Sequence, residues 1–303
     1  MQKLIVLLIS ILSLCFHTKN FAQAKDKLIA AASTVKIYKS IDGIDLKAYI
    51  FNPPNHQKSD ERPAIIFFFG GGWKNGTPAQ FIKHCEYLAA RGMVAITADY
   101  RVFDRHGVQV NECVSDAKSA IRWMRQQADS LGINPNKIIG AGGSSGGHLA
   151  ASAAIIDGFD ASQDDLKISP IPNALVLFNP PLVLAALPEI GFSEVALGQL
   201  RKRMGTEPIL ISPYHHVKSG ICPTIIFHGS QDTKVFLMFS EAFCKVMTEN
   251  GNNCQLLIYE GERHAFFNYG RKDNGPFIDT VKRIDDFLVN LGYLTTVPIV
   301  RAY

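Results

Sequence analysis

Short, uninterrupted apolar runs recur along the chain from residue 63 to residue 259, and longer segments of mixed polarity separate them. Such runs are typical of strands that are buried on both faces of a parallel sheet. The expected strands are Pro63–Phe69, Met93–Tyr100, Lys137–Ala141, Ala174–Phe178, Thr224–His228 and Gln255–Tyr259. Two earlier extended runs, Val35–Lys39 and Leu46–Phe51, flank Asp42-Gly43, a dipeptide that favours a hairpin turn.

The segments between these runs indicate helices. Residues 110–131 carry apolar side chains every three or four positions, as a helix packed on a sheet does. Further helices are expected at residues 78–91, His148–Ile156, 236–250 and 277–291. Residues 181–222 lack a clear period and predict a lid or an excursion. Strands that alternate with helices predict an α/β fold, a mostly parallel sheet with helices on both faces, in one domain over residues 25–303.

The first residues have a different pattern. Lys3 precedes the apolar run Leu4–Phe16, and the small-x-small site Ala22-Gln23-Ala24 follows. This order predicts a secretory signal peptide cleaved after Ala24, and therefore a secreted or periplasmic protein without a stable membrane span. The alternatives are an uncleaved anchor or a lipid anchor at Cys15, although the large Leu14 before that cysteine departs from the lipoprotein pattern.

Charge and cysteine content exclude some functions. The formal charge of +4 comes from 31 basic and 27 acidic residues without a basic cluster, which argues against nucleic-acid binding. Five cysteines remain after residue 24, and no Cys-x-x-Cys spacing suggests a zinc or redox site. Cys244 and Cys254 flank a turn and could form a disulfide. Buried free thiols are the alternative.

The chemistry begins with Gly-Gly-Ser-Ser-Gly-Gly-His at residues 142–148, between an expected strand and an expected helix. A G-x-S-x-G motif in that setting holds a nucleophilic serine on a tight, strained turn. Gly142 and Gly146 would allow the strand and the helix to approach closely. The motif fits Ser144, and shifted by one residue it also fits Ser145.

Two further segments supply candidate partners. Asp232 lies in His-Gly-Ser-Gln-Asp-Thr-Lys-Val, directly after an expected strand, and His264 follows the last expected strand. An acid at the carboxyl end of a strand can face the site, although capping the next helix is a commoner role. The rival acids Asp164, Asp165 and Glu207 follow no strand.

A glycine run at residues 69–73, Phe-Gly-Gly-Gly-Trp, follows the first long buried strand. Glycines there allow backbone N–H groups to point at a developing oxyanion. Trp73 comes next, and its indole could lie at the mouth of the site to stack on a sugar or an aromatic acyl group, or it could pack the loop onto the core.

These motifs resemble those of hormone-sensitive-lipase-like esterases in the α/β-hydrolase superfamily, whose elbow reads Ser-Ala-Gly-Gly-Asn-Leu-Ala. The glycine run is similar to the family's His-Gly-Gly-Gly, with Phe69 in place of histidine. The segments around Asp232 and His264 are similar to HGxxDxxV and GxxHxF. The resemblance covers residues 34–291 and implies the α/β-hydrolase fold and a Ser144, Asp232 and His264 triad, in the chain order that this fold uses.

The resemblance also selects Ser144 over Ser145 and places Ser145 with Gly71 and Gly72 in the oxyanion hole. It is strongest to secreted bacterial acetyl-esterase/lipase-like hydrolases, which include acetylxylan and feruloyl esterases. We therefore expect a serine esterase that removes short acyl groups, acetyl foremost, from small-molecule or carbohydrate esters. Such an enzyme needs no cofactor.

Two alternatives remain at this stage: a peptidase similar to the prolyl-oligopeptidase group, and an inactive binding protein on the same fold. A metal site at His215-His216 is not expected, because adjacent side chains point apart and no carboxylate at ligand spacing supports them. His148 is expected to pack beneath the elbow.

Overall fold

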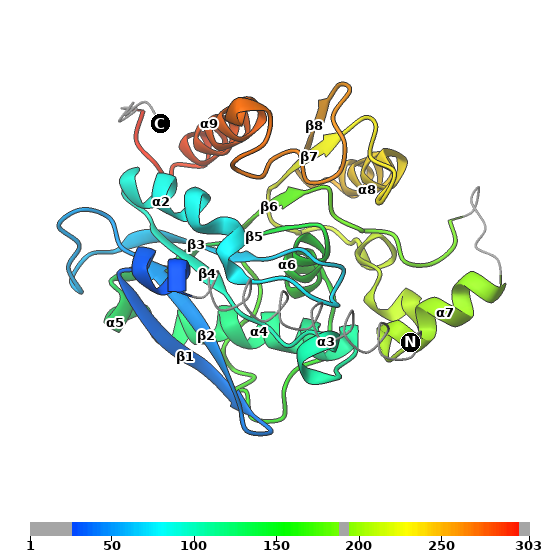
Figure 1. Cartoon of the computed structure of the whole chain (residues 1–303), viewed down its shortest axis with the longest axis horizontal. Coiled ribbons are helices and arrows are strands. Elements are labelled where there is room, and N and C mark those ends of the chain that lie inside the picture. Colours follow the sequence, from blue (N-terminus) through cyan, green and yellow to red (C-terminus); the bar gives the residue numbers. More distant parts are fainter. Residues whose placement is uncertain (1–25, 188–193, 297–303) are drawn as a thin grey trace, which may run out of the picture.

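The computed structural model describes residues 26–187 and 194–296, and the predicted signal peptide lies outside them. A single eight-stranded sheet crosses the molecule, with helices on both sides (Figure 1). The strand order is β1-β2-β4-β3-β5-β6-β7-β8, and β2 runs antiparallel to both of its neighbours while the other pairs are parallel. This is the mostly parallel sheet that the sequence predicts.

The strands fall close to the predicted runs. They are β1 (Thr34–Ile41), β2 (Ile44–Phe51), β3 (Arg62–Phe68), β4 (Val94–Ala98), β5 (Ile133–Gly143), β6 (Ala174–Phe178), β7 (Thr224–Gly229) and β8 (Cys254–Tyr259). The turn between β1 and β2 has positive φ at Asp42 (51°) and Gly43 (75°), which is the geometry that Asp-Gly favours in two-residue hairpins. The strand β5 begins earlier than predicted because Ile133 pairs with Arg62.

The observed helices include the five that were predicted, with shifted ends, and add two that were not, over Phe103–His106 and Glu194–Met204. They are α2 (Ile82–Ala90), α3 (Phe103–His106), α4 (Val110–Gln126), α5 (Ala128–Leu131), α6 (Ser145–Ile155), α7 (Glu194–Met204), α8 (Leu237–Glu249) and α9 (Gly275–Asn290), with 3-10 turns η1 (Pro78–Phe81), η2 (Pro208–Ile211), η3 (Pro213–His216) and η4 (Lys272–Asn274). The helix predicted over 110–131 is interrupted at Gln127, which separates α4 from α5. The excursion at 181–222 contains α7, η2 and η3.

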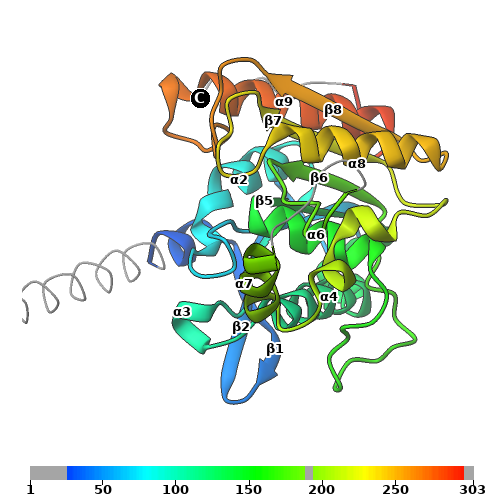
Figure 2. The same cartoon turned by 90° about the vertical axis from the view of Figure 1, so that its right-hand side faces the viewer.

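Two apolar clusters sandwich the sheet. In β3, Ile66 and Phe68 belong to the cluster shared with α4, α6 and α8, and Ile65 and Phe67 belong to the cluster shared with α2 and α9. This alternation is the two-residue period of a strand covered on both faces. Helix α7 projects from one side of these layers in Figure 1 and faces the viewer in Figure 2.

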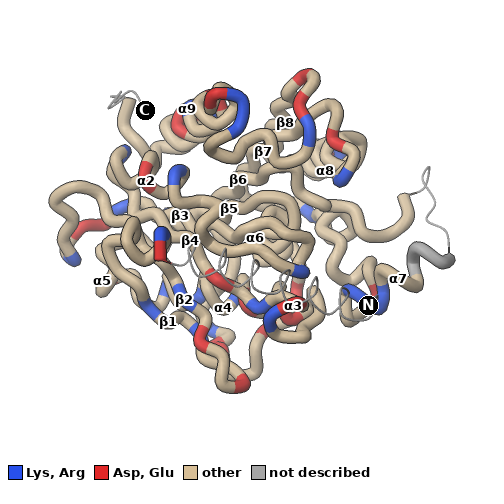
Figure 3. The backbone as a smooth tube through the Cα atoms, in the orientation of Figure 1, with Lys and Arg blue, Asp and Glu red and all other residues tan. Residues whose placement is uncertain are grey.

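Cys244 in α8 forms a disulfide with Cys254 in β8, which confirms the predicted pair. Cys85, Cys113 and Cys222 are free thiols. Across the described ranges, no helix is long and apolar enough to cross a membrane. Acidic and basic residues are interspersed over the chain (Figure 3).

Candidate active site

Ser144 occupies the turn between β5 and α6, with φ 52° and ψ −123°. This backbone conformation is rare for a residue with a side chain and stores strain at the turn. The flanking glycines make the turn possible. A Cβ at Gly146 would lie 1.9 Å from the carbonyl oxygen of Phe68, and one at Gly142 would lie 2.4 Å from the carbonyl of Gly146. The turn therefore requires glycine at both positions, as the sequence predicts.

His264 connects the serine to the predicted acid. Its Nε2 lies 3.0 Å from Ser144 Oγ, and its Nδ1 lies 2.6 Å from Asp232 Oδ2. Because a carboxylate only accepts, the proton is assigned to Nδ1, and Nε2 is then free to accept from the serine hydroxyl. Ser145, the serine of the alternative register, begins α6 and is only 1% exposed.

Asp232 follows β7, and its side chain is fully buried. Its Oδ1 accepts hydrogen bonds from the backbone N–H groups of Lys234 (2.8 Å) and Val235 (3.0 Å), while Oδ2 contacts His264. Burial raises the pKa of this carboxyl, but the hydrogen bonds from His264 and the two N–H groups outweigh burial and leave the pKa below its ordinary value. Asp232 thus stays ionised. It orders the turn before α8 with one oxygen and holds the imidazole with the other.

The rival acids make contacts elsewhere. Asp164 pairs with Arg122 of α4 at 3.0 Å, and Glu207 pairs with Arg201. Asp165 accepts a hydrogen bond from the backbone of Lys167. None of these contacts involves His264.

The glycine run lies beside the nucleophile. A Cβ at Gly70 would lie 3.3 Å from the Cβ of Ser144. The next three residues, Gly71 (φ 133°), Gly72 (62°) and Trp73 (57°), all have positive φ. In the described part of the chain, no hydrogen bond occupies the N–H of Gly71 or of Gly72. These two donors are available to a ligand.

Trp73 packs the loop onto the core, so the stacking role at the mouth of the site loses its basis. Its indole is 8% exposed, and Nε1 donates to Nδ1 of His148 at 3.3 Å. Burial lowers the pKa of His148 to about 4, and its Nε2 donates to the carbonyl of Ile211 at 2.7 Å. The guanidinium of Arg203 in α7 lies 5.4 Å from the indole ring and donates to the carbonyl of Gly72. His148 therefore packs beneath the elbow, as predicted.

The sequence also matches a known protein family. The model of the BD-FAE family matches residues 49–247. The chain belongs to the BD-FAE family. Its eight-stranded sheet and its relatives identify it as an α/β-hydrolase of the esterase- and lipase-like serine hydrolase superfamily.

Solved structures agree with the family assignment. Esterase 2 of the planctomycete Thermogutta terrifontis with propionate bound is 48% identical, covers 88% of this chain and 96% of its own, and superposes with a TM-score of 0.84. The same esterase phosphorylated by paraoxon gives 48% identity, coverage of 87% and 96%, and a TM-score of 0.81.

Curated relatives are more distant. Lipase 2 of Moraxella sp. (strain TA144) is 29% identical over 92% of this chain and 70% of its own length. A probable isoprenylcysteine alpha-carbonyl methylesterase of Oryza sativa subsp. japonica is 26% identical over 67% of this chain. The chain spans about half of that plant protein, 51% of its length.

Sequence reasoning missed the polar residues that support the BD-FAE site. The amide of Gln80 accepts from the N–H of Gly70 at 2.7 Å and donates to Asn268 at 2.9 Å, so it joins the glycine loop to the loop that carries His264. Asn179 directly follows β6, has φ 36°, and accepts a hydrogen bond from the N–H of Ala265. The position of Asn179 directly after a buried strand was the sequence feature that could have indicated its place in the site.

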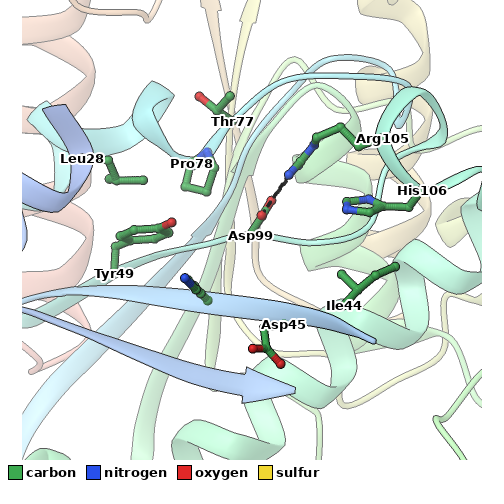
Figure 4. Close-up of a pocket in the computed structure, with 10 residues that line it drawn as sticks. Leu28, Ile44, Asp45, Tyr49, Thr77, Pro78, Asp99, Arg105 and His106 are labelled. Atoms are coloured by element: carbon green, nitrogen blue, oxygen red, sulfur yellow. Dashed lines mark hydrogen bonds and ion pairs between the residues drawn. The ribbon is translucent and has the colours of Figure 1, made fainter. Parts of the chain in front are cut away.

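Other candidate features lie apart from the reacting groups. His215 hydrogen-bonds Ser212 and His216 hydrogen-bonds the carbonyl of Ile209. In residues 26–187 and 194–296, no three histidine, cysteine or acidic residues are grouped to hold a metal. A cavity of about 180 Å³ contains the Asp99–Arg105 ion pair (2.7 Å) (Figure 4), and Ser144 does not line it.

Proposed function

We propose that the protein is a serine carboxylesterase that hydrolyses esters of short acyl groups. The observation that carries the proposal is the continuous hydrogen-bond chain from Ser144 through His264 to the ionised Asp232. A serine hydroxyl in this arrangement has a base at hydrogen-bond distance, and the base has a buried anion behind it. These are the elements that acyl transfer to serine requires.

In the first half of the reaction, Ser144 Oγ attacks the carbonyl carbon of the ester while His264 Nε2 takes the hydroxyl proton. The resulting imidazolium is stabilised by Asp232. When the tetrahedral intermediate collapses, the bond to the alcohol oxygen breaks and His264 returns the proton to that oxygen. The acyl group remains on Ser144. Water then repeats the sequence, with His264 as base, and releases the carboxylic acid.

We assign the stabilisation of the negative charge on the tetrahedral oxygen to the N–H groups of Gly71, Gly72 and Ser145. The N–H of Ser145 opens α6, where the positive end of the helix dipole adds to its effect. Loss of one such donor typically costs about 3 kcal/mol of transition-state stabilisation. The proximity of Gly70 to Ser144 supports this assignment.

The acyl preference is inferred from relatives. The Thermogutta esterase has been solved with propionate and with butyrate bound, which supports short acyl groups for this chain as well. We propose acetyl to butyryl esters as substrates. A carbohydrate alcohol, as in acetylated xylan, is supported by the resemblance of the motifs to acetylxylan esterases, while the burial of Trp73 removes the stacking argument for it.

Export belongs to the same proposal. The apolar segment after Lys3 and the Ala-Gln-Ala site support cleavage after Ala24 and action outside the cytoplasm. The N-terminal sequence of the protein recovered from a secreting bacterial host tests it. A mature chain that starts at Lys25 is expected, and retention of residues 1–24 would contradict it.

Two measurements test the activity. Paraoxon or a fluorophosphonate should label the wild-type protein on Ser144, and Ser144→Ala should abolish both labelling and ester turnover. The matched control is Ser145→Ala, which keeps its backbone N–H and should retain most activity. Acetyl and decanoyl esters of one alcohol then test chain length. Absence of labelling would indicate an inactive binding protein, and faster decanoyl cleavage would favour a lipase.

A further inference from the structure

A hollow of about 550 Å³ borders His264. It is formed by the loop after β7 and by the long loop between β8 and α9. Its lining consists of Gln231, Gly261, Glu262, Arg263, His264, Phe266, Arg271 and Lys272. Because His264 belongs both to the hydrogen-bond chain and to this lining, the hollow lies directly beside the reacting groups.

The lining has an excess of positive charge. Lys272 Nζ lies 2.6 Å from Glu262, whose side chain is only 15% exposed, so these two charges neutralise each other. Arg263 and Arg271 are exposed, and neither guanidinium group has a hydrogen bond or an ion pair with another residue that the structure describes. Two guanidinium groups thus line the hollow without a partner. Arginine is the side chain best suited to pair with a carboxylate, through two parallel hydrogen bonds.

The two loops that form the hollow are held together rigidly. The N–H of Gln231 donates to the carbonyl of Glu262 at 2.9 Å, and the N–H of Gly261 donates to Ser230 Oγ at 2.9 Å. A Cβ at Gly229 would lie 2.3 Å from the carbonyl oxygen of Glu262, so the two loops are in direct backbone contact. Because the two loops are already joined, a ligand would lose little of its binding free energy to ordering them.

The backbone that follows Arg271 is also constrained. Three consecutive residues other than glycine have positive φ: Lys272 (44°), Asp273 (51°) and Asn274 (63°). The Asn274 side chain accepts a hydrogen bond from the N–H of Gly270 and closes the turn. Strained backbone of this kind persists only where the surroundings fix it, and it is concentrated at ligand sites. Here it holds the segment that carries Arg271 at the edge of the hollow.

We propose that this hollow is a subsite for a carboxylate carried by the alcohol part of the ester. The inference rests on the proposed function, in which His264 returns its proton to the alcohol oxygen. The alcohol part of the ester must then lie next to His264, which lines the hollow and whose side chain is 21% exposed. Arg263 and Arg271 would pair with a carboxylate there, and the preferred substrates would be esters of hydroxy acids or of acidic sugars.

The test compares 3-acetoxybenzoate with 3-acetoxybenzamide. Both release the same acyl group from a phenol of similar shape, and only the first carries a carboxylate. The measured quantity is the ratio of kcat/KM for the anionic ester to that for the neutral ester. Wild-type protein should favour the anionic ester at low ionic strength, and the ratio should fall as sodium chloride rises through 0.1 M, where the screening length is about 10 Å.

Removing the charge of each arginine tests whether these two residues cause the preference for the anionic ester. Arg263→Gln and Arg271→Gln should each lower the ratio about two- to fivefold, the range for a partly exposed ion pair, and the double variant should lower it further. The matched control is Lys167→Gln, an exposed residue in the loop that leads into the amino end of β6, which removes the same charge and should leave the ratio unchanged.

The outcomes separate the two proposals. If neither ester is hydrolysed by wild-type protein, the proposed esterase function fails. If both are hydrolysed but the ratio is the same in the wild type, the arginine variants and Lys167→Gln, the function stands and the carboxylate subsite is wrong. An equal fall in the three single variants, Arg263→Gln, Arg271→Gln and Lys167→Gln, would show a general field effect of net charge, which also overturns the subsite.

Discussion

The stability of the protein should depend on pH through His84, a histidine that takes no part in the proposed chemistry. His84 lies in α2, is fully buried, and has no hydrogen-bond partner for either ring nitrogen among the described residues. Five phenylalanine rings surround its imidazole at centroid distances of 4.9–6.1 Å: Phe67, Phe81, Phe178, Phe267 and Phe277. Burial among these rings lowers the pKa of His84 to about 3.

The direction of the effect follows from linkage. In the unfolded chain His84 titrates near pH 6.5, so below that pH the unfolded state binds a proton that the folded state does not. The free energy of unfolding therefore falls as the pH falls from 6.5 toward 3, and the loss is complete below pH 3. Between pH 8 and pH 5, His84 alone should remove about 2 kcal/mol, and the full span from 6.5 to 3 corresponds to about 5 kcal/mol.

Replacing His84 by leucine isolates this contribution, because leucine does not titrate. Urea unfolding of the wild type and of His84→Leu at pH 8 and pH 5 gives four free energies of unfolding. The difference between pH 8 and pH 5 should be about 2 kcal/mol smaller in the variant. Leu88→Ala, a buried change in the same helix, is the control and should destabilise equally at both pH values. An unchanged pH difference in His84→Leu would refute the reasoning.

Three further changes probe the site and its frame. Asp232→Asn should leave the fold intact and lower kcat for an acetyl ester by three to four orders of magnitude, roughly as in other triads; near-normal turnover would require another orienting acid. Gly146→Ala should destabilise by about 3 kcal/mol or more, because its Cβ meets backbone, whereas Gly198→Ala in α7, with open space around it, should be neutral or stabilising in thermal unfolding. Reduction of Cys244–Cys254 should remove about 3 kcal/mol, and a Cys254→Ser variant should not respond to reductant.

The sequence predicts the parts of the fold that a local pattern specifies. The strand β6 has the predicted ends because an apolar run there is bounded by polar residues and prolines. The strand β5 starts before its predicted beginning, because Ile133 already pairs with Arg62. The residues that follow, Asn134-Pro135-Asn136, look like a turn in the sequence. No local pattern predicts that Arg203 of α7 contacts the glycine loop, because that contact joins residues 131 positions apart.

Which parts of the site could be predicted depends on whether the residue type indicates an unusual backbone conformation. Trp73, Ser144, Asn179 and Ala265 all have positive φ without being glycine, and they follow β3, β5, β6 and β8, respectively. Each such conformation costs about 1–3 kcal/mol, so it persists only where neighbouring contacts fix it. Those contacts are now visible, from the bond between Trp73 and His148 to that between Asn179 and the N–H of Ala265. The glycines around the elbow could be recognised in the sequence because close packing there excludes any side chain, whereas the residue type of Trp73 does not indicate its positive φ.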